Sequence, residues 1–263
     1  MGVALEYHDA LEQLAWQIEL GADEALGDDP LDRYDLPVAA PKPVAVAGQS
    51  QTPVASPVVA DEVDPVAVAR DMAQGARDIA GLQAAMAAFE YCDLKKGARS
   101  LVFADGKPDA RVMIIGEAST REEDTIGTPF VGPAGALLDR MFAAIGLDRA
   151  SPDADHAIYL TNFLPWRLPQ NREPAPQELA MLLPFVKRHV ELADPKLVVL
   201  MGNIACQGVL GRRGIARMRG QWQEAWGRRA MPMLHPLALM KDPLTKREAW
   251  VDLLSIKSEL AKS

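Results

Sequence analysis

Four short, mainly apolar runs mark the chain after residue 110, and stretches with helical periodicity separate them. The runs span residues 111–115, 157–161, 196–201 and 230–234. Apolar positions recur at helical spacing over residues 134–145, 176–192, 203–210 and 246–260. Strands that are apolar throughout and alternate with helices indicate a parallel sheet covered on both faces. The pattern therefore predicts an α/β fold, a three-layer α/β/α sandwich around a four-stranded parallel sheet.

The first 60 residues follow a different pattern and divide into two parts. Apolar side chains recur at roughly helical spacing from residue 4 to residue 26, which predicts an amphipathic helix within residues 1–35. Residues 36–60 are rich in Pro, Ala and Val, which predicts a flexible linker. Helical character returns over residues 61–91. We therefore expect the α/β domain to span residues 61–263, preceded by an N-terminal helical extension.

Composition places the chain among the globular proteins. Hydrophobic residues make up 49% of its 263 residues and charged residues 24%, which is too apolar for a chain that is disordered throughout. No run of about 18 or more apolar residues is present, which excludes a membrane-spanning helix. The first six residues lack the basic start and the apolar core of a secretory signal, so we expect a cytoplasmic protein.

The formal net charge of −8 is unevenly distributed. Residues 1–90 hold 4 Lys and Arg against 16 Asp and Glu, whereas residues 91–263 hold 24 against 20. Because the acidic segment should repel nucleic acid, we do not expect it to bind DNA. The simpler interpretation is that its helices dock on the domain. The alternative is that it tethers a protein partner or covers the basic surface. The basic remainder leaves a nucleic-acid ligand open, because phosphates respond to the local field.

Polar residues with useful chemistry follow the predicted strands. Gly116 and Glu117 follow the first strand, with Phe130 further along the same connection, Asn162 ends the second strand, and His235 follows the fourth. Ligands of open parallel sheets bind beyond the carboxyl ends of the strands, so we expect these side chains to converge. A carboxylate, a carboxamide, an aromatic ring and an imidazole would recognise one small ring and supply an acid–base pair.

Each of these residues alone has a simpler interpretation. A Gly-Glu pair after a strand is often a turn that opens a helix, and Asn162 is suited to capping a turn through its side chain. Phe130 beside Pro129 is typical of packing, and a lone His235 is typical of a structural histidine. The functional interpretation depends on the coincidence of four apt residues on one edge of one sheet.

Further motifs surround these residues from about Phe89 to the C-terminus. They are Gly116-Glu117-Ala118, Glu123-Asp124, Gly127, Pro129-Phe130-Val131-Gly132, Ala134-Gly135, Leu137-Leu138-Asp139, Thr161-Asn162, Asn171-Arg172-Glu173-Pro174, Arg219-Gly220 and His235-Pro236. In this order they resemble the uracil-DNA glycosylase superfamily and are closest to its family 4, the iron–sulfur branch. Each piece alone is weak, and the combined pattern is highly specific.

The resemblance implies a role for each candidate. Glu117 matches the carboxylate that positions water and faces the sugar, and His235 matches the histidine near O2 of the base. Phe130 matches the ring that stacks on uracil, Asn162 the amide that reads the base edge, and Glu123 an acidic position near C5 of the base. The catalytic candidates are thus Glu117 and His235, and the substrate-binding candidates are Gly116, Phe130, Asn162 and Glu123.

The chemistry of these groups suits cleavage of an N-glycosidic bond. A buried carboxylate stabilises the positive charge that develops on the sugar and orients water, while an imidazole stabilises the departing base. An Asn amide offers an acceptor to N3–H of uracil and a donor to O4, and cytosine mismatches one fixed orientation of that amide. The base must leave the duplex to reach such a site.

The chain holds two cysteines, Cys92 and Cys206, and neither has a CxxC partner. The cluster that the resemblance implies needs four cysteines, of which only Cys92 stands at a matching position. The other three positions fall near Phe89, Trp166 and Leu182. We interpret this as packing that has replaced the cluster, with Cys92 an ordinary buried thiol, and we expect neither a metal nor another cofactor.

Ser119 and Thr120 stand where the family motif continues with Pro-Gly, so the loop that positions water is expected to differ in shape. Either hydroxyl is a candidate to contact a DNA phosphate or the water. Arg219 and Lys241 are candidate DNA contacts among the basic residues of this part of the chain, although such residues usually form a solvated face. Leu237 is a candidate wedge that fills the gap left by a flipped base, with core packing as the alternative.

These observations predict a monofunctional uracil-DNA glycosylase that leaves an abasic site in uracil-containing DNA. The absence of a well-placed lysine argues against a strand-cutting lyase. The alternative is a protein that binds uracil or damaged DNA but has little or no catalytic activity, because Ser119 and Thr120 replace the Pro-Gly of the family motif. An unrelated nucleotide or phosphate-ester enzyme lacks support, since neither a GxGxxG nor a GxxxxGK[ST] loop is present.

Overall fold

A computed structural model describes residues 63–262 of the chain. The helix predicted within residues 1–35 and the linker predicted over residues 36–60 lie outside the described residues and stay predictions. Among residues 63–262, no helix combines the length and the apolar character needed to cross a membrane.

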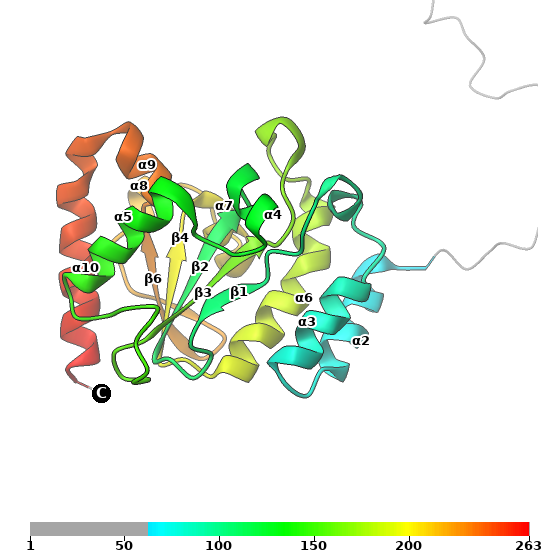
Figure 1. The fold of residues 1–263 in the computed structure, drawn as a ribbon, viewed down its shortest axis with the longest axis horizontal. Helices are drawn as coiled ribbons and strands as arrows, with labels where there is room; N and C mark the ends of the chain where they lie inside the picture. The colour runs from blue at the N-terminus through cyan, green and yellow to red at the C-terminus, as the bar shows by residue number, and fades with distance from the viewer. Residues whose placement is uncertain (1–62, 263) are drawn as a thin grey trace, which may run out of the picture. The chain divides into compact units, whose positions relative to one another are not determined.

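Strands and helices alternate along the described residues (Figure 1). The strands are β1 (Ala104–Gly106), β2 (Val112–Ala118), β3 (Ile158–Leu164), β4 (Leu197–Met201), β5 (Gln223–Ala225) and β6 (Arg228–Met233). The α-helices are α2 (Pro65–Gly75), α3 (Ile79–Ala88), α4 (Arg121–Ile126), α5 (Gly132–Ala143), α6 (Pro176–Ala193), α7 (Asn203–Leu210), α8 (Ile215–Met218), α9 (Pro236–Lys241) and α10 (Lys246–Leu260). Short 3-10 helices are η1 (Asp93–Gly97), η2 (Pro169–Asn171) and η3 (Pro243–Thr245). The predicted helices 203–210 and 246–260 are confirmed at both ends.

The sheet has the order β1-β3-β2-β4-β6-β5. Its four central strands are parallel, as predicted, whereas β1 and β5 pair antiparallel with β3 and β6 at the two edges. The α/β fold class is therefore confirmed, and the predicted number of four strands is corrected to six. The edge strands were missed because they are three residues long and pair on one side only, so they carry no apolar run.

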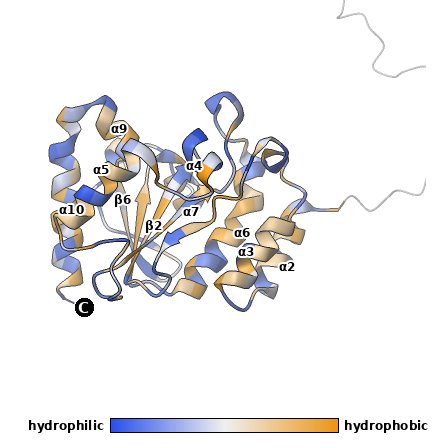
Figure 2. Ribbon diagram, in the orientation of Figure 1, coloured by the Kyte–Doolittle hydropathy of each residue, from blue (hydrophilic) through white to orange (hydrophobic). Residues whose placement is uncertain are grey.

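Each face of the sheet is covered by helices, which confirms the three-layer arrangement (Figures 1 and 2). Successive residues of β2 alternate between the faces, as extended backbone requires. Val112 and Ile114 pack with α5, α9 and α10, while Met113 and Ile115 pack with α6 and α7. Helices α2 and α3 lie outside α6 and extend that layer.

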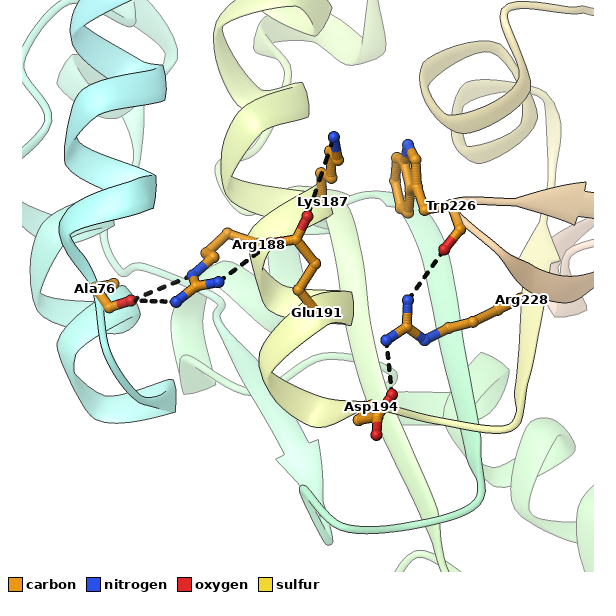
Figure 3. Close-up of polar contacts among 7 residues, drawn as sticks. All are labelled: Ala76, Lys187, Arg188, Glu191, Asp194, Trp226 and Arg228. Carbon is orange, nitrogen blue, oxygen red and sulfur yellow. Dashed lines mark hydrogen bonds and ion pairs between the residues drawn. The ribbon is translucent and has the colours of Figure 1, made fainter.

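Arginine side chains hold the outer elements on α6 and its C-terminus. The guanidinium of Arg188 in α6 donates to the carbonyl of Ala76, the residue after α2, through Nε at 3.2 Å and Nη2 at 2.9 Å (Figure 3). Arg228, at the start of β6, pairs through Nη2 with Asp194 at the end of α6, at 2.7 Å (Figure 3). These two arginines therefore add polar contacts between α6 and the residue after α2, and between the end of α6 and β6.

The positions where the resemblance implies a cluster are filled by hydrophobic packing. Phe89, Cys92, Trp166 and Leu182 belong to one core and are buried, and the Phe89 ring makes an edge contact with Phe185 at 5.4 Å. Only Cys92 offers a metal-binding atom, and burial raises the pKa of its thiol, which favours the protonated form that does not bind metal. These side chains do not fit an iron–sulfur cluster. Over residues 63–262, no group of three or more His, Cys, Asp and Glu side chains could hold a metal ion.

We predict that the purified protein holds neither iron nor acid-labile sulfide at a stoichiometric level, because one protonated thiol among apolar side chains cannot ligate a cluster. Metal analysis and a sulfide assay on protein purified without oxygen would measure both. Close to four irons per chain would contradict the packing interpretation.

Candidate active site

The candidate residues gather at the edge of the sheet where the four parallel strands end. β2 is the topological switch point, because β3, the next parallel strand along the chain, lies on one side of it and β4 on the other. Open α/β sheets bind ligands in the crevice at such a point. Gly116 of β2 stands opposite Asn162 of β3, while Gly202 and His235 follow β4 and β6 closely.

Glu117, near the end of β2, directs its carboxylate at the start of α7. Its Oε1 accepts a hydrogen bond from the backbone N–H of Ile204 at 3.0 Å. Gly202 has φ of +98°, and a methyl group there would lie 2.3 Å from Cδ of Glu117, so this close approach requires glycine. Burial raises the pKa of Glu117, although the N–H groups of Ile204 and Asn203 oppose the rise. The result is a carboxylate held by backbone donors in a partly desolvated position.

The carboxamide of Asn162 is held on its nitrogen side. Nδ2 donates to Oε2 of Glu123 at 3.2 Å and to Oγ of Ser119 at 3.4 Å. Ser119 in turn donates its hydroxyl proton to the carbonyl of Leu164 at 3.2 Å. A methyl group at Gly116 would lie 2.3 Å from Oδ1 of Asn162. The amide nitrogen therefore faces protein acceptors, and the amide oxygen faces Gly116.

Glu123 lies behind these groups and organises them. It is the third residue of α4, where its Oε2 accepts the N–H of Thr120 at 2.7 Å and the Thr120 hydroxyl accepts the N–H of Glu123, a capping box. Its Oε1 accepts the backbone N–H of Phe130. Burial raises the pKa of Glu123, against the effect of these N–H donors. The structure thus places Glu123 against Asn162 and the Phe130 backbone.

Phe130 is fixed by bonds at both of its backbone polar groups. Its φ is +50°, a left-handed conformation that costs a non-glycine residue about 1–2 kcal/mol. Besides the Glu123 contact at its N–H, its carbonyl accepts from Nη2 of Arg149 at 3.1 Å. Arg149 also pairs with Asp105 at 2.9 Å and with Asp139 at 2.8 Å. The ring reaches Gly116, where a methyl group would lie 2.6 Å from Cζ.

His235 caps α9 and stacks on Phe130. Its Nδ1 accepts the backbone N–H of Leu237 at 3.2 Å, and its ring lies 5.5 Å from the Phe130 ring at an interplanar angle of 23°. Burial lowers the pKa of His235 to about 4, so the imidazole is neutral at neutral pH. Because Nδ1 accepts, the ring proton resides on Nε2. His235 therefore offers a neutral N–H donor.

A cleft of about 540 Å³ opens beside this cluster, and Glu117 lines it. Phe130, Asn162 and His235 are not among its lining residues and are 2%, 3% and 9% exposed. The structure thus brings the side chains of Phe130, Asn162 and His235 together at Gly116, whereas Glu117, the next residue of β2, contacts the start of α7 and lines the cleft.

Four of the five residues predicted to contact DNA line the cleft, and the fifth does not. Those that line the cleft are Ser119, Thr120, Leu237 and Lys241. Ser119 is buried and bonded to its neighbours, whereas Leu237 is 40% exposed. Arg219 is not among the lining residues, because its guanidinium pairs with the buried Asp252 and, at 3.5 Å, with Glu248 of α10. The tertiary structure gives Arg219 a structural ion pair that its motif does not reveal.

Three further arginines line the cleft, and the sequence did not single them out as site residues. Arg121 opens α4, Arg172 precedes α6, and Arg213 follows α7. Arg172 also donates a hydrogen bond to Glu178 at 2.9 Å. This hydrogen bond from the guanidinium holds the pKa of Glu178 below its usual value. Two of them carried a signal in the sequence, Arg172 through the Asn171-Arg172 motif and Arg213 through the cluster of basic residues after the third predicted strand, whereas Arg121 carried none. Arg229, by contrast, is the second residue of β6, at the opposite edge of the sheet, and pairs with Glu259 at 2.9 Å.

Comparison with known proteins identifies related chains. Residues 103–254 match the sequence profile of the Uracil DNA glycosylase superfamily. A type-4 uracil-DNA glycosylase of Archaeoglobus fulgidus is 34% identical over 174 residues, which cover 63% of this chain and 84% of that protein. One from Sulfurisphaera tokodaii is 30% identical over 181 residues, 65% and 79% of the two chains. One from Thermotoga maritima is 31% identical over 155 residues, 57% and 77% of the two chains.

We predict that Gly116→Ala lowers the free energy of unfolding by about 1–3 kcal/mol, because the new methyl group overlaps Asn162 and Phe130. Gly75→Ala, at the end of α2 with nothing within 4 Å of the added carbon, is the matched control and is expected to cost nothing. Chemical denaturation of both variants measures the difference. Equal stability of the two would contradict the tight packing around Gly116.

Proposed function

The chain belongs to the uracil-DNA glycosylase superfamily, and from that premise we propose that it excises uracil from DNA as a monofunctional enzyme. It hydrolyses the N-glycosidic bond of a flipped-out uracil and leaves an abasic site. The observation that carries this proposal is that Phe130, Asn162 and His235 pack together at Gly116, while Glu117, the next residue of β2, lines a cleft with basic residues.

Base recognition is assigned to Asn162 and Phe130. Oδ1 of Asn162 accepts N3–H of uracil, while cytosine would present a lone pair to the same oxygen. The sequence also suggested that the Asn162 amide donates to O4 of uracil. We assign that hydrogen bond to other donors, because Nδ2 of Asn162 already donates to Glu123 and Ser119. The Phe130 ring supplies the apolar contact for the pyrimidine.

Bond cleavage is assigned to Glu117 and His235. Glu117 stabilises the positive charge that develops on the sugar and orients a water for attack on C1′, taking up a proton from that water. The electron pair of the broken bond leaves with the base, and Nε2–H of His235 stabilises the negative charge that spreads to O2. A neutral donor suits this role, because it needs no proton transfer before the bond breaks.

DNA binding is assigned to the basic cleft. Arg121, Arg213 and Lys241 provide cations for phosphates, and the exposed Leu237 fills the gap that the flipped base leaves. The strand stays intact, since the group directed at the sugar is a carboxylate, while Lys241 lies exposed on α9. The cytoplasmic location, the absence of a cofactor and a protein partner for the acidic N-terminal segment stay predictions.

We predict that the protein releases uracil from a uracil-containing oligonucleotide, with strand breaks visible only after heat and alkali. Glu117→Gln is expected to lower the rate constant about 10²-fold or more, the scale of losing one preorganised electrostatic group. Asn162→Ala is expected to lower it too, through loss of base binding. Glu122→Gln, an exposed change in the first turn of α4, is the control and is expected to keep the rate.

Other outcomes of this assay assign the function differently. Tight, uracil-dependent binding without product would support the alternative, a uracil- or damage-binding protein. Binding that is indifferent to uracil, with no product, would exclude both functions. Strand breaks without alkali that disappear in Lys241→Ala would show lyase chemistry instead of simple hydrolysis.

The pH dependence is predicted to show an acidic limb and no loss near pH 6.5. Glu117 must be ionised, and its pKa is raised by burial, so the single-turnover rate rises with pH through that pKa and then levels off. His235 has a pKa of about 4 and is already neutral, so no proton is lost from it between pH 6 and 8. A rate that falls as pH rises through 6.5 would show that the imidazolium is the active form.

A further inference from the structure

We propose that Glu123 sets the base specificity of the site as a positioning residue: its carboxylate fixes the Asn162 carboxamide with Oδ1 toward the bound base. This inference rests on the proposed function and deepens it. Glu123 itself makes no contact with substrate in this assignment. It acts through the orientation of a neighbouring amide.

The first step is the crowding of donors around one carboxylate. The two oxygens of Glu123 accept three N–H groups, which come from the backbone of Thr120 and of Phe130 and from the side chain of Asn162. The residue is 5% exposed. Three donors converging on a buried group require an acceptor at both oxygen positions, which an ionised carboxylate satisfies and a carboxamide does not.

The second step follows from the chemistry of the two amide ends. A carboxylate only accepts hydrogen bonds, so the end of Asn162 that faces it must be NH₂. Ser119 reinforces this choice, because its hydroxyl proton is directed to the Leu164 carbonyl and its lone pairs are left for Nδ2. Two acceptors therefore hold the amide nitrogen, and Oδ1 points to Gly116 and the Phe130 ring.

The third step is the consequence for the base. With Oδ1 presented, the site accepts a donor at N3 of a pyrimidine, which uracil has and cytosine lacks. With the amide turned over, NH₂ would face the base, match N3 of cytosine and oppose N3–H of uracil. The choice between the two bases thus depends on which group holds the far side of Asn162.

The same carboxylate holds the stacking partner. Its Oε1 accepts the N–H of Phe130, whose left-handed backbone needs external bonds to persist. Glu123 therefore links the residue that reads the base edge to the residue that stacks on the base. A helix cap alone would explain the Thr120 bonds but not the contacts to Asn162 and Phe130.

The test compares uracil preference in two proteins in which Glu117→Gln slows excision, so that binding is measured before product forms. In a Glu117→Gln background, the Kd for a single-stranded oligonucleotide with one cytosine is divided by the Kd for the same strand with uracil. Adding Glu123→Gln is expected to lower this ratio about 10-fold or more, since the new NH₂ turns the Asn162 amide over. Glu122→Gln in the same background is the matched control and is expected to keep the ratio.

The ratio of the two Kd values distinguishes a positioning role of Glu123 from a purely structural one. A purely structural role would weaken binding of both strands and leave the ratio unchanged, and that result would overturn the proposal. Gln is accepted at the third position of a capping box, so α4 is expected to form in the variant. Thermal unfolding of each protein verifies this.

A second measurement needs no change at position 123. In the Glu117→Gln background, 3-deazauracil replaces uracil and puts C–H where N3–H stood. We expect about 10-fold weaker binding, because Oδ1 loses its donor, and equal binding would overturn the proposed amide orientation. Absence of uracil preference in this background, while wild type excises uracil, would also overturn it. Absence of excision by wild type would instead refute the proposed function.

Discussion

The buried carboxylate of Glu123 is the interaction on which the geometry of the site depends. It joins the first turn of α4, the backbone of Phe130 and the amide of Asn162 in one hydrogen-bonded unit. Each of these groups comes from a different segment, and each would otherwise have more than one orientation. Burial makes the arrangement sensitive to small changes, because an unpaired donor in this environment is costly.

Two other side chains show how burial prepares a site for charge separation. Desolvation raises the pKa of Glu117 and lowers that of His235, so the carboxylate is a stronger base than in water and the imidazole is neutral. Backbone N–H groups at the start of α7 keep Glu117 in place, and the N–H of Leu237 fixes the His235 tautomer. In the proposed function, the positions of these two groups are thus set before substrate binds, which is the condition for electrostatic catalysis.

The basic residues serve two different purposes in the described part of the chain. Arg188, Arg219 and Arg228 make ion pairs or carbonyl bonds that hold outer elements on the sheet's helical layers. Arg121 and Arg213 line the cleft, where Arg213 also pairs with Glu173. Only some of the arginines in this basic part of the chain are therefore placed to contact a ligand. The number of arginines in a segment does not measure its affinity for DNA.

The sequence by itself determined the four parallel strands, the helices between them and the gathering of Gly116, Glu117, Asn162 and His235 at one edge. It did so because apolar runs and helical periodicity are local properties, and because parallel strands place their carboxyl ends together. The two edge strands, the ion pair of Arg219 and the contact of Glu123 with Asn162 were decided by tertiary structure alone. Each depends on partners distant in the chain: Arg219 meets Asp252 across 33 positions and Glu123 meets Asn162 across 39. Local patterns specify which groups are present, but only packing of distant segments decides which donor faces which acceptor.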